Sequence, residues 1–298
     1  MKHIFIINPI AGKRDYEKLI PIIKAQFESD DQYQIIITET KGHAQKIAST
    51  YHQEDDVCLY AVGGDGTAFE ILNGINEKVT MAIIPNGTGN DYFKMIKYDA
   101  SNIAQTLIDT INGRQVMVDY GKANDLRYLN ASSMGLDADV NQLANRLSDK
   151  LFIPKSLLYI VAALITVLKP KSITIDMYLD NDRYISKKAL LIAVMNGRFY
   201  GGGFLPTPDA NIQDGNLDIC VVESMRLVRI LKLLPRYFKG QHVGLPEVSF
   251  YKSSYVKLKT DHPVLYGCDG EVNQASMIEY HLVRSGLSLR IPKESDLV

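Results

Sequence analysis

Short apolar runs alternate with helix-spaced segments over about the first 120 residues. Four runs rich in β-branched residues end in Gly, Pro, Asn or Thr and are typical of buried strands: residues 4–7, 34–38, 57–62 and 81–84. Between them, apolar residues recur at helical spacing in residues 15–27, 44–51 and 68–75. The order βαβαβαβ predicts a three-layer α/β domain around a parallel sheet.

The pattern changes near residue 121. Runs that alternate or stay apolar between turn residues predict strands at 127–131, 172–179, 188–195, 217–222, 248–251 and 255–259. Helical segments at 157–168 and 225–239 interrupt these strands. We therefore predict an α/β nucleotide-binding domain at 1–121 and a mostly antiparallel β-sandwich at 122–298, whose last few residues are free to return to the first domain.

Composition narrows the function without assigning it. A net charge of −1 and a pI near 6.6 give no global attraction to nucleic acid, so we expect no nucleic-acid partner. The three cysteines lack paired or CxxC spacing, and the six histidines form no metal-binding or nucleophile pattern. The apolar run after Lys2 is too short for a signal peptide, and residues 157–168 fall short of the roughly 20 that span a bilayer. We expect a cytoplasmic protein.

Three loops that follow predicted strands have the composition of a phosphate cradle. They are Asn8, Pro9, Ile10, Ala11, Gly12 and Lys13; Gly63, Gly64, Asp65, Gly66 and Thr67; and Asn86, Gly87, Thr88, Gly89, Asn90 and Asp91. In a parallel sheet these loops share one edge, and helices expected to begin at Thr67 and Asp91 would add positive dipole ends. Gly64 is expected at a positive φ close to phosphate. A single loop of this kind is usually a mere turn, but three on one edge favour triphosphate binding.

An ordered set of motifs follows the same loops. It comprises GGDGT at 63–67 with Glu70 and Asn73-Gly74, PNGTGND at 85–91, NASSMGLD at 130–137, Asn196-Gly197, GGGF at 201–204, Pro208-Asp209-Ala210, DGNLD at 214–218 and Asp269-Gly270-Glu271. Along nearly the whole chain this set resembles the diacylglycerol kinase catalytic-domain family of lipid kinases. NAD kinases are similar at GGDGT, but their next glycine motif and Asn-Glu pair are missing here. Ala68-Phe69 and Gly89 depart from the common family residues without removing a polar group that the chemistry needs.

The resemblance implies an ATP site and two catalytic carboxylates. The ATP-binding residues would be Asn8, Pro9, Ile10, Ala11, Gly12, Thr40, Gly63, Gly64, Asp65, Gly66, Thr67 and Thr88. Asp65 would face Mg²⁺ or its waters, and Glu271 would accept the proton of the lipid hydroxyl, a task that suits a positioned carboxylate. The competing interpretations are a helix-capping turn aspartate and a solvated turn glutamate.

The resemblance also implies a second metal site, formed by Asn211, Asp214 and Asn216, where carboxylate and carbonyl oxygens would meet Mg²⁺ away from the nucleotide. Spacing alone favours a different interpretation, an Asp-Gly turn before the strand at 217–222.

The favoured hypothesis is an ATP- and Mg²⁺-dependent lipid kinase that converts diacylglycerol to phosphatidic acid, with acyl chains held by the β lobe. The alternatives are a kinase for another lipid or for a soluble acceptor such as NAD, and a non-catalytic nucleotide-binding membrane protein. In segment 225–239, basic residues lie along one helical face: Arg226, Arg229, Lys232, Arg236 and Lys239. We expect this helix to contact the anionic inner face of the membrane, with a solvated helix ended by Pro235 as the alternative. Homodimer formation stays open.

Overall fold

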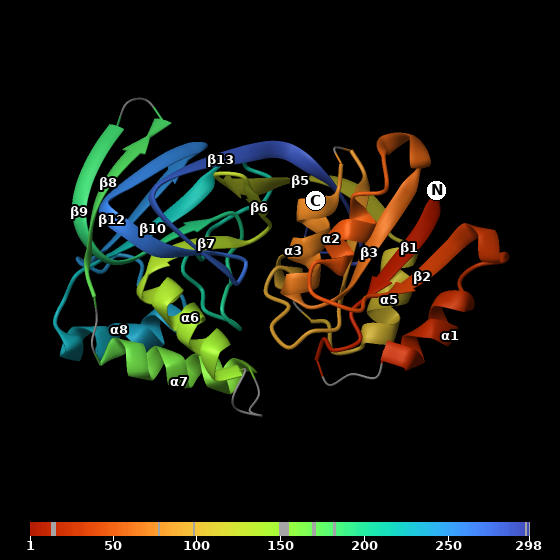
Figure 1. Cartoon of the computed structure of the whole chain (residues 1–298), viewed down its shortest axis with the longest axis horizontal. Coiled ribbons are helices and arrows are strands. Elements are labelled where there is room, and N and C mark those ends of the chain that lie inside the picture. The colour runs from red at the N-terminus through yellow and green to blue at the C-terminus, as the bar shows by residue number, and fades with distance from the viewer. Residues whose placement is uncertain are drawn as a thin grey trace. The chain divides into compact units, whose positions relative to one another are not determined.

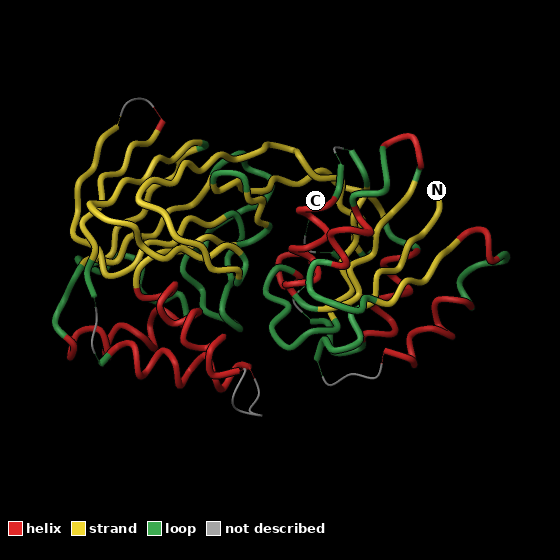
Figure 2. Tube along the Cα trace, viewed as in Figure 1, coloured by secondary structure: helices red, strands yellow, loops and turns green. Residues whose placement is uncertain are grey.

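The chain folds into two compact units in a computed structural model (Figures 1 and 2). The structure describes residues 1–12, 16–76, 78–97, 99–148, 155–168, 171–180, 183–295 and 297. Lys13 and Asp15 and the side chains of Asp137 and Leu157 lie outside what is described. One unit comprises Met1–Tyr120 and Arg284–Val298, and the other Gly121–Val283.

A parallel sheet forms the centre of the first unit. Its strands are β1 (Lys2–Ile7), β2 (Tyr33–Ile37), β3 (Val57–Gly63) and β4 (Thr80–Pro85), in the order β4-β3-β1-β2 with every pair parallel. Every residue of β3 and β4 is buried, as a strand covered on both faces requires. The end of β13 (Glu271–Ile291) adds a further parallel strand beside β4. The predicted parallel sheet is confirmed.

Helices cover both faces of this sheet. They are η1 (Tyr16–Lys18), α1 (Leu19–Lys24), η2 (Asp30–Gln32), α2 (His43–Ala48), η3 (Gln53–Asp55), α3 (Asp65–Gly74), α4 (Phe93–Ile96) and α5 (Ile103–Ile111). Helices α1 and α5 share a core with alternate strand residues such as Phe5 and Tyr60. The other face is left for α3, which packs on β3, and for α2, which packs on α3. Two predicted helix starts are wrong by two residues each, because α3 begins at Asp65 and α4 at Phe93.

The second unit is the predicted antiparallel β-sandwich. Its strands are β6 (Leu126–Tyr128), β7 (Ala131–Gly135), β8 (Ile173–Leu179), β9 (Arg183–Met195), β10 (Leu217–Glu223), β11 (Val248–Ser253), β12 (Tyr255–Cys268), most of β13 and the last three residues of β5 (Arg114–Ala123), whose earlier part belongs to the first unit. The ladders of β9 with β7, β8 and β10, and of β12 with β7, β8 and β13, are antiparallel. Because β9 and β12 each pair with β8 at one end and with β7 at the other, the sheet folds over on itself.

Three helices pack on this sandwich: α6 (Leu136–Ser148), α7 (Lys155–Val167) and α8 (Leu227–Phe238). The sequence predicted α7 and α8 but missed α5, α6, β5 and β13. The run predicted as one strand at 127–131 is instead the end of β6, a two-residue link and the start of β7. Among the described helices, none combines the length and apolarity needed to cross a membrane.

Candidate functional site

The three glycine loops of the first unit are in contact with one another. A Cβ on Gly87 would lie 2.4 Å from the Cα of Gly64, and a Cβ on Gly12 would lie 2.5 Å from the carbonyl oxygen of Asn86. The Asn8 amide closes the arrangement, donating from Nδ2 to the Thr67 hydroxyl at 3.2 Å. Side chains at these glycines would force the loops apart, so the backbone itself forms the carboxyl edge of the sheet.

The expected positive φ of Gly64 is wrong. Its φ is −99° and its ψ −171°, which is extended backbone that any residue adopts. A Cβ on Gly64 would lie 3.3 Å from the Gly87 Cα, so the glycine favours the close approach of the two loops and not a special conformation of its own. Gly12 does have a positive φ of 68°.

Much of the cradle is open to solvent. Ile10 is 88% exposed, and Thr40, Gly66 and Thr88 are exposed as well. Thr40 lies in the loop between β2 and α2, which Glu70 of α3 anchors by accepting the N–H groups of Gly42 at 2.9 Å and Ala44 at 3.2 Å. Glu70 therefore positions the fourth loop of this edge.

Asp65 ties the loop after β3 to the loop after β4. Its carboxylate accepts the N–H groups of Asp91 at 3.1 Å and Tyr92 at 3.2 Å, while Lys94 pairs with Asp91 at 2.6 Å. Burial, and then the nearby Asp91 carboxylate, raise the pKa of Asp65 to about 6. The helix-cap interpretation fails, because Asp65 is inside the first turn of α3 and its carboxylate is directed at another loop.

Asn86 is a buried residue of the edge that the sequence did not select as part of the site. It is fully buried, and neither its side-chain oxygen nor its side-chain nitrogen has a hydrogen-bond partner within the described part of the protein. An unsatisfied buried amide costs about 1–3 kcal/mol. Such groups are normally satisfied by an ordered water or a ligand, which fits a polar binding edge.

In the second unit, Glu271 follows a tight hairpin turn. Asp269 and Gly270, with φ of 43° and 94°, form the two-residue connection between β12 and β13. Cys268 and Glu271 are the paired residues that close it. Glu271 is thus the first residue of β13, and its side chain is half-buried.

The loop of Asn211, Asp214 and Asn216 does not fit a Mg²⁺ site as folded. The Asp214 carboxylate accepts the Asn216 N–H at 3.0 Å through one oxygen and the Lys252 ammonium at 2.8 Å through the other. The Asn211 side chain accepts the Gln213 N–H at 3.0 Å. A divalent cation would have to displace an ammonium that already neutralises the carboxylate. No group of three or more His, Cys, Asp or Glu able to hold a metal occurs in the described regions.

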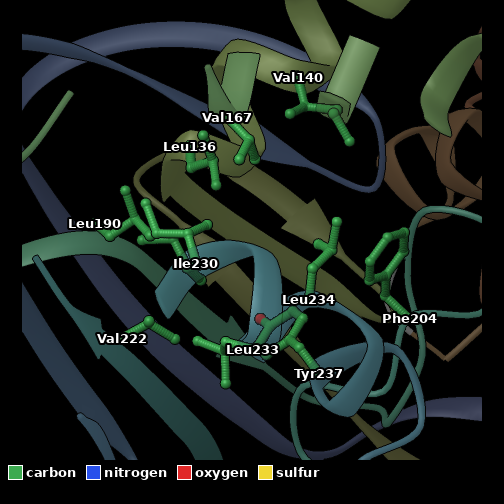
Figure 3. A pocket seen from close by; sticks show the side chains of 12 residues that line it. Leu136, Val140, Val167, Leu190, Phe204, Val222, Ile230, Leu233, Leu234 and Tyr237 are labelled. Carbon is green, nitrogen blue, oxygen red and sulfur yellow. The ribbon is translucent and has the colours of Figure 1, made fainter. Parts of the chain in front are cut away.

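An apolar cavity lies beneath the helices of the second unit (Figure 3). Its walls come from α6, α7, α8, β9, β10 and Phe204: Leu136, Val140, Ala163, Val167, Leu190, Leu191, Phe204, Val222, Ile230, Leu233, Leu234 and Tyr237. The cavity measures about 30 Å³, room for roughly two water-sized molecules.

Comparisons with known proteins cover nearly the whole chain. The model of the diacylglycerol kinase catalytic domain matches residues 2–123, and that of the YegS C-terminal NAD kinase beta sandwich-like domain matches residues 130–288. The chain belongs to the diacylglycerol kinase catalytic-domain family. Its membership accounts for the pairing of an α/β unit with a β-sandwich.

Relatives in this family share modest identity over full length. A diacylglycerol kinase of Staphylococcus carnosus is 25% identical over 97% of this chain and 94% of its own. One of Mycobacterium tuberculosis is 26% identical over 97% and 94%. A crystal structure of a candidate diacylglycerol kinase of Bacillus anthracis has 25% identity and a TM-score of 0.77, covering 97% of each chain. Yeast NADH kinase shares the fold, at 12% identity and a TM-score of 0.51 over 97% of this chain and 82% of that one.

We expect Gly64→Val to abolish ATP binding. Gly64 Cβ would lie 3.3 Å from the Gly87 Cα, so a branched side chain separates the two loops. Calorimetry on the folded variant tests this, and unchanged nucleotide affinity would contradict the cradle.

We expect Asp65→Asn to lower activity roughly 10²-fold and to reduce the pH dependence of the protein's stability. A raised carboxyl pKa means that the folded protein binds more protons than the unfolded chain, so stability falls as pH rises from about 4 to about 6. The variant lacks this pH-dependent loss but also lacks one acceptor oxygen for the N–H groups of Asp91 and Tyr92. Relative to the parent, its free energy of unfolding should therefore gain at most about 3 kcal/mol between pH 4 and pH 7. Denaturant unfolding at pH 4 and pH 7 measures it, and equal pH dependence in both proteins would contradict the raised pKa.

We expect that added Mg²⁺ does not raise the melting temperature of the nucleotide-free protein by binding to the Asp214 loop. Lys252→Met should destabilise the protein by about 1–3 kcal/mol, because Asp214 and the buried Asp218 lose their shared cation. Added Mg²⁺ should restore part of that loss, and Asp214→Asn in the same background should remove the restoration. Saturable Mg²⁺ stabilisation of the parent, abolished by Asp214→Asn, would contradict the assignment.

Proposed function

We propose that this protein is an ATP- and Mg²⁺-dependent lipid kinase that converts diacylglycerol to phosphatidic acid. The observation that carries the proposal is the meeting of three glycine loops around Asp65, at the ligand-binding edge of a parallel sheet, in a chain of this family. The apolar cavity of the second unit supplies an environment for an acyl chain.

The proposed chemistry is a single phosphoryl transfer. The lipid hydroxyl oxygen attacks the γ-phosphorus, the bond from that phosphorus to the bridging oxygen breaks, and ADP leaves. Glu271 accepts the hydroxyl proton. Backbone N–H groups of the loops hold the phosphates, and Mg²⁺ bound with ATP neutralises their charge. Asp65 is the carboxylate of this edge suited to orient the metal or its waters.

The acyl chain needs the cavity to open. A lipid tail is far larger than the roughly two water-sized molecules that the cavity holds, so we expect the helices above it to move apart. Helix α8 supplies Ile230, Leu233, Leu234 and Tyr237 to the walls. Its displacement would admit a chain without disturbing the strands below.

The outer sides of α7 and α8 suit an anionic membrane. On α8, Val228 is 65% exposed, and Leu231 and Phe238 are each 45% exposed. Lys232 and Arg236 lie next to this stripe and are exposed as well. An exposed apolar stripe beside a basic one is the arrangement of interfacial helices, and each basic residue near an anionic surface contributes about 1 kcal/mol.

Helix α7, which contacts α8, adds a second exposed apolar stripe formed by Val161, Ile165 and Leu168, which directly follows the helix. The same two helices line the cavity on their inner sides. A membrane docked on them would therefore face the roof of the proposed acyl site.

Incubation with γ-labelled ATP, Mg²⁺ and a mixed lipid extract tests the reaction. We expect label in phosphatidic acid, and its loss with Glu271→Gln in a normally folded protein. Label in another lipid would change the acceptor, and label in a parallel NAD reaction would replace the lipid assignment. Absence of transfer to any acceptor would favour a non-catalytic nucleotide-binding protein.

We expect Lys232→Glu with Arg236→Glu to weaken sedimentation with anionic vesicles and to raise the KM for vesicle-borne lipid, since repulsion replaces attraction. Turnover of a short-chain, water-soluble lipid should be unchanged. Arg229 is a poorer choice because it pairs with Glu247. The matched control reverses two exposed lysines elsewhere, Lys24 and Lys188. Equal vesicle binding by the test variant, the control and the parent at low salt would remove the membrane role.

A further inference from the structure

The turn before Glu271 is tied to a neighbouring segment by one carboxylate. Asp269 accepts the N–H groups of Leu129 at 2.6 Å, Asn130 at 3.1 Å and Ala131 at 2.9 Å. Its own N–H donates back to the Ala131 carbonyl at 2.9 Å. An Asp-Gly hairpin turn does not need hydrogen bonds from the aspartate side chain to another segment, because its two residues readily adopt the positive φ angles that the turn requires. Here the aspartate side chain serves another segment as well.

That segment is itself fixed. Leu129 and Asn130 form the link between β6 and β7, and the Asn130 side chain donates to the Phe199 carbonyl. The buried Asn196 side chain donates to the Leu129 carbonyl at 2.6 Å, and the Asn196 N–H donates to the Asn130 carbonyl at 2.9 Å. The hairpin is therefore fastened to the link, and the link is fastened to the segment after β9.

We propose that Asp269 is a positioning residue that holds the Glu271 carboxylate in place for proton transfer, which rests on the function proposed above. Exposed hairpin tips are among the more mobile parts of a fold. A proton acceptor misplaced by about 1 Å can cost about 10²-fold in rate. Three N–H groups on one carboxylate convert the tip into a rigid support for the residue two positions on.

Asp269→Asn is the discriminating variant. The amide keeps the shape and the turn propensity, but it offers one acceptor oxygen and places an NH₂ group against N–H donors. We expect kcat to fall at least tenfold while KM for ATP stays within twofold, because the nucleotide loops lie in the other unit.

Asp180→Asn is the matched control. Asp180 accepts the N–H groups of Ser254 and Tyr255 at another turn of the same sandwich, away from Glu271 in the chain. We expect a comparable fall in melting temperature with kcat within twofold of the parent. An equal loss of kcat in both variants would show that sandwich stability, and not positioning, is responsible. Parental kcat in Asp269→Asn would overturn the proposal directly.

Amide hydrogen exchange tests the positioning role of Asp269 independently of the proposed kinase activity. Asp269→Asn should raise exchange at residues 129–131 and at the hairpin at least tenfold, whereas Asp180→Asn should not. If the parent phosphorylates no acceptor, the proposed function fails, yet exchange still reports whether Asp269 holds the tip. If the parent is active and Glu271→Gln is equally active, the role of Glu271 fails, and with it the positioning role of Asp269. Unchanged exchange at the tip would overturn the proposal on its own.

Discussion

The candidate nucleotide site depends on backbone meeting backbone where the loops after β3 and β4 touch. Gly87 approaches Gly64 so closely that it has no room for a side chain, and Gly12 makes a similar approach to the Asn86 carbonyl. Once these loops are together, Asp65 can reach across to the N–H groups of Asp91 and Tyr92. Because these glycines have no side chains, the loops present a surface of backbone peptide groups, whose N–H groups bind phosphate oxygens.

Much of the first unit could be predicted from sequence because its strands are buried on both faces and appear as unbroken apolar runs. β13 was missed for the opposite reason. Most side chains in its first half are exposed or only partly buried, and Ser285 interrupts it with a φ of 46°. The start of α3 was missed because Asp65 and Gly66 resemble turn residues, although tertiary contacts make them helical. Local sequence patterns cannot predict tertiary contacts with residues that are far away in the chain.

The candidate site, like the fold, could be predicted from the sequence only in part. The order of the strands was enough to predict that the three loops meet. The packing of Gly64 against Gly87 and the burial of Asn86 are visible only in the folded structure. The Asp214 loop shows the limit most clearly. Its spacing was compatible with either a turn or a metal loop, and the residue that decides, Lys252, is 38 positions away on β11. The motif suggested that Mg²⁺ binds Asp214, and in the structure the Lys252 ammonium occupies that carboxylate.

The return of residues 284–298 to the first unit has a consequence for synthesis. β4 has β3 on one side and the end of β13 on the other, and that second neighbour is made only after the strands of the sandwich. As the chain leaves the ribosome, the parallel sheet must wait with one edge unpaired until the whole sandwich has been translated. An unpaired strand edge is a template for wrong partners. Nascent chains that stall before residue 284 should therefore depend on chaperones more than the finished protein does.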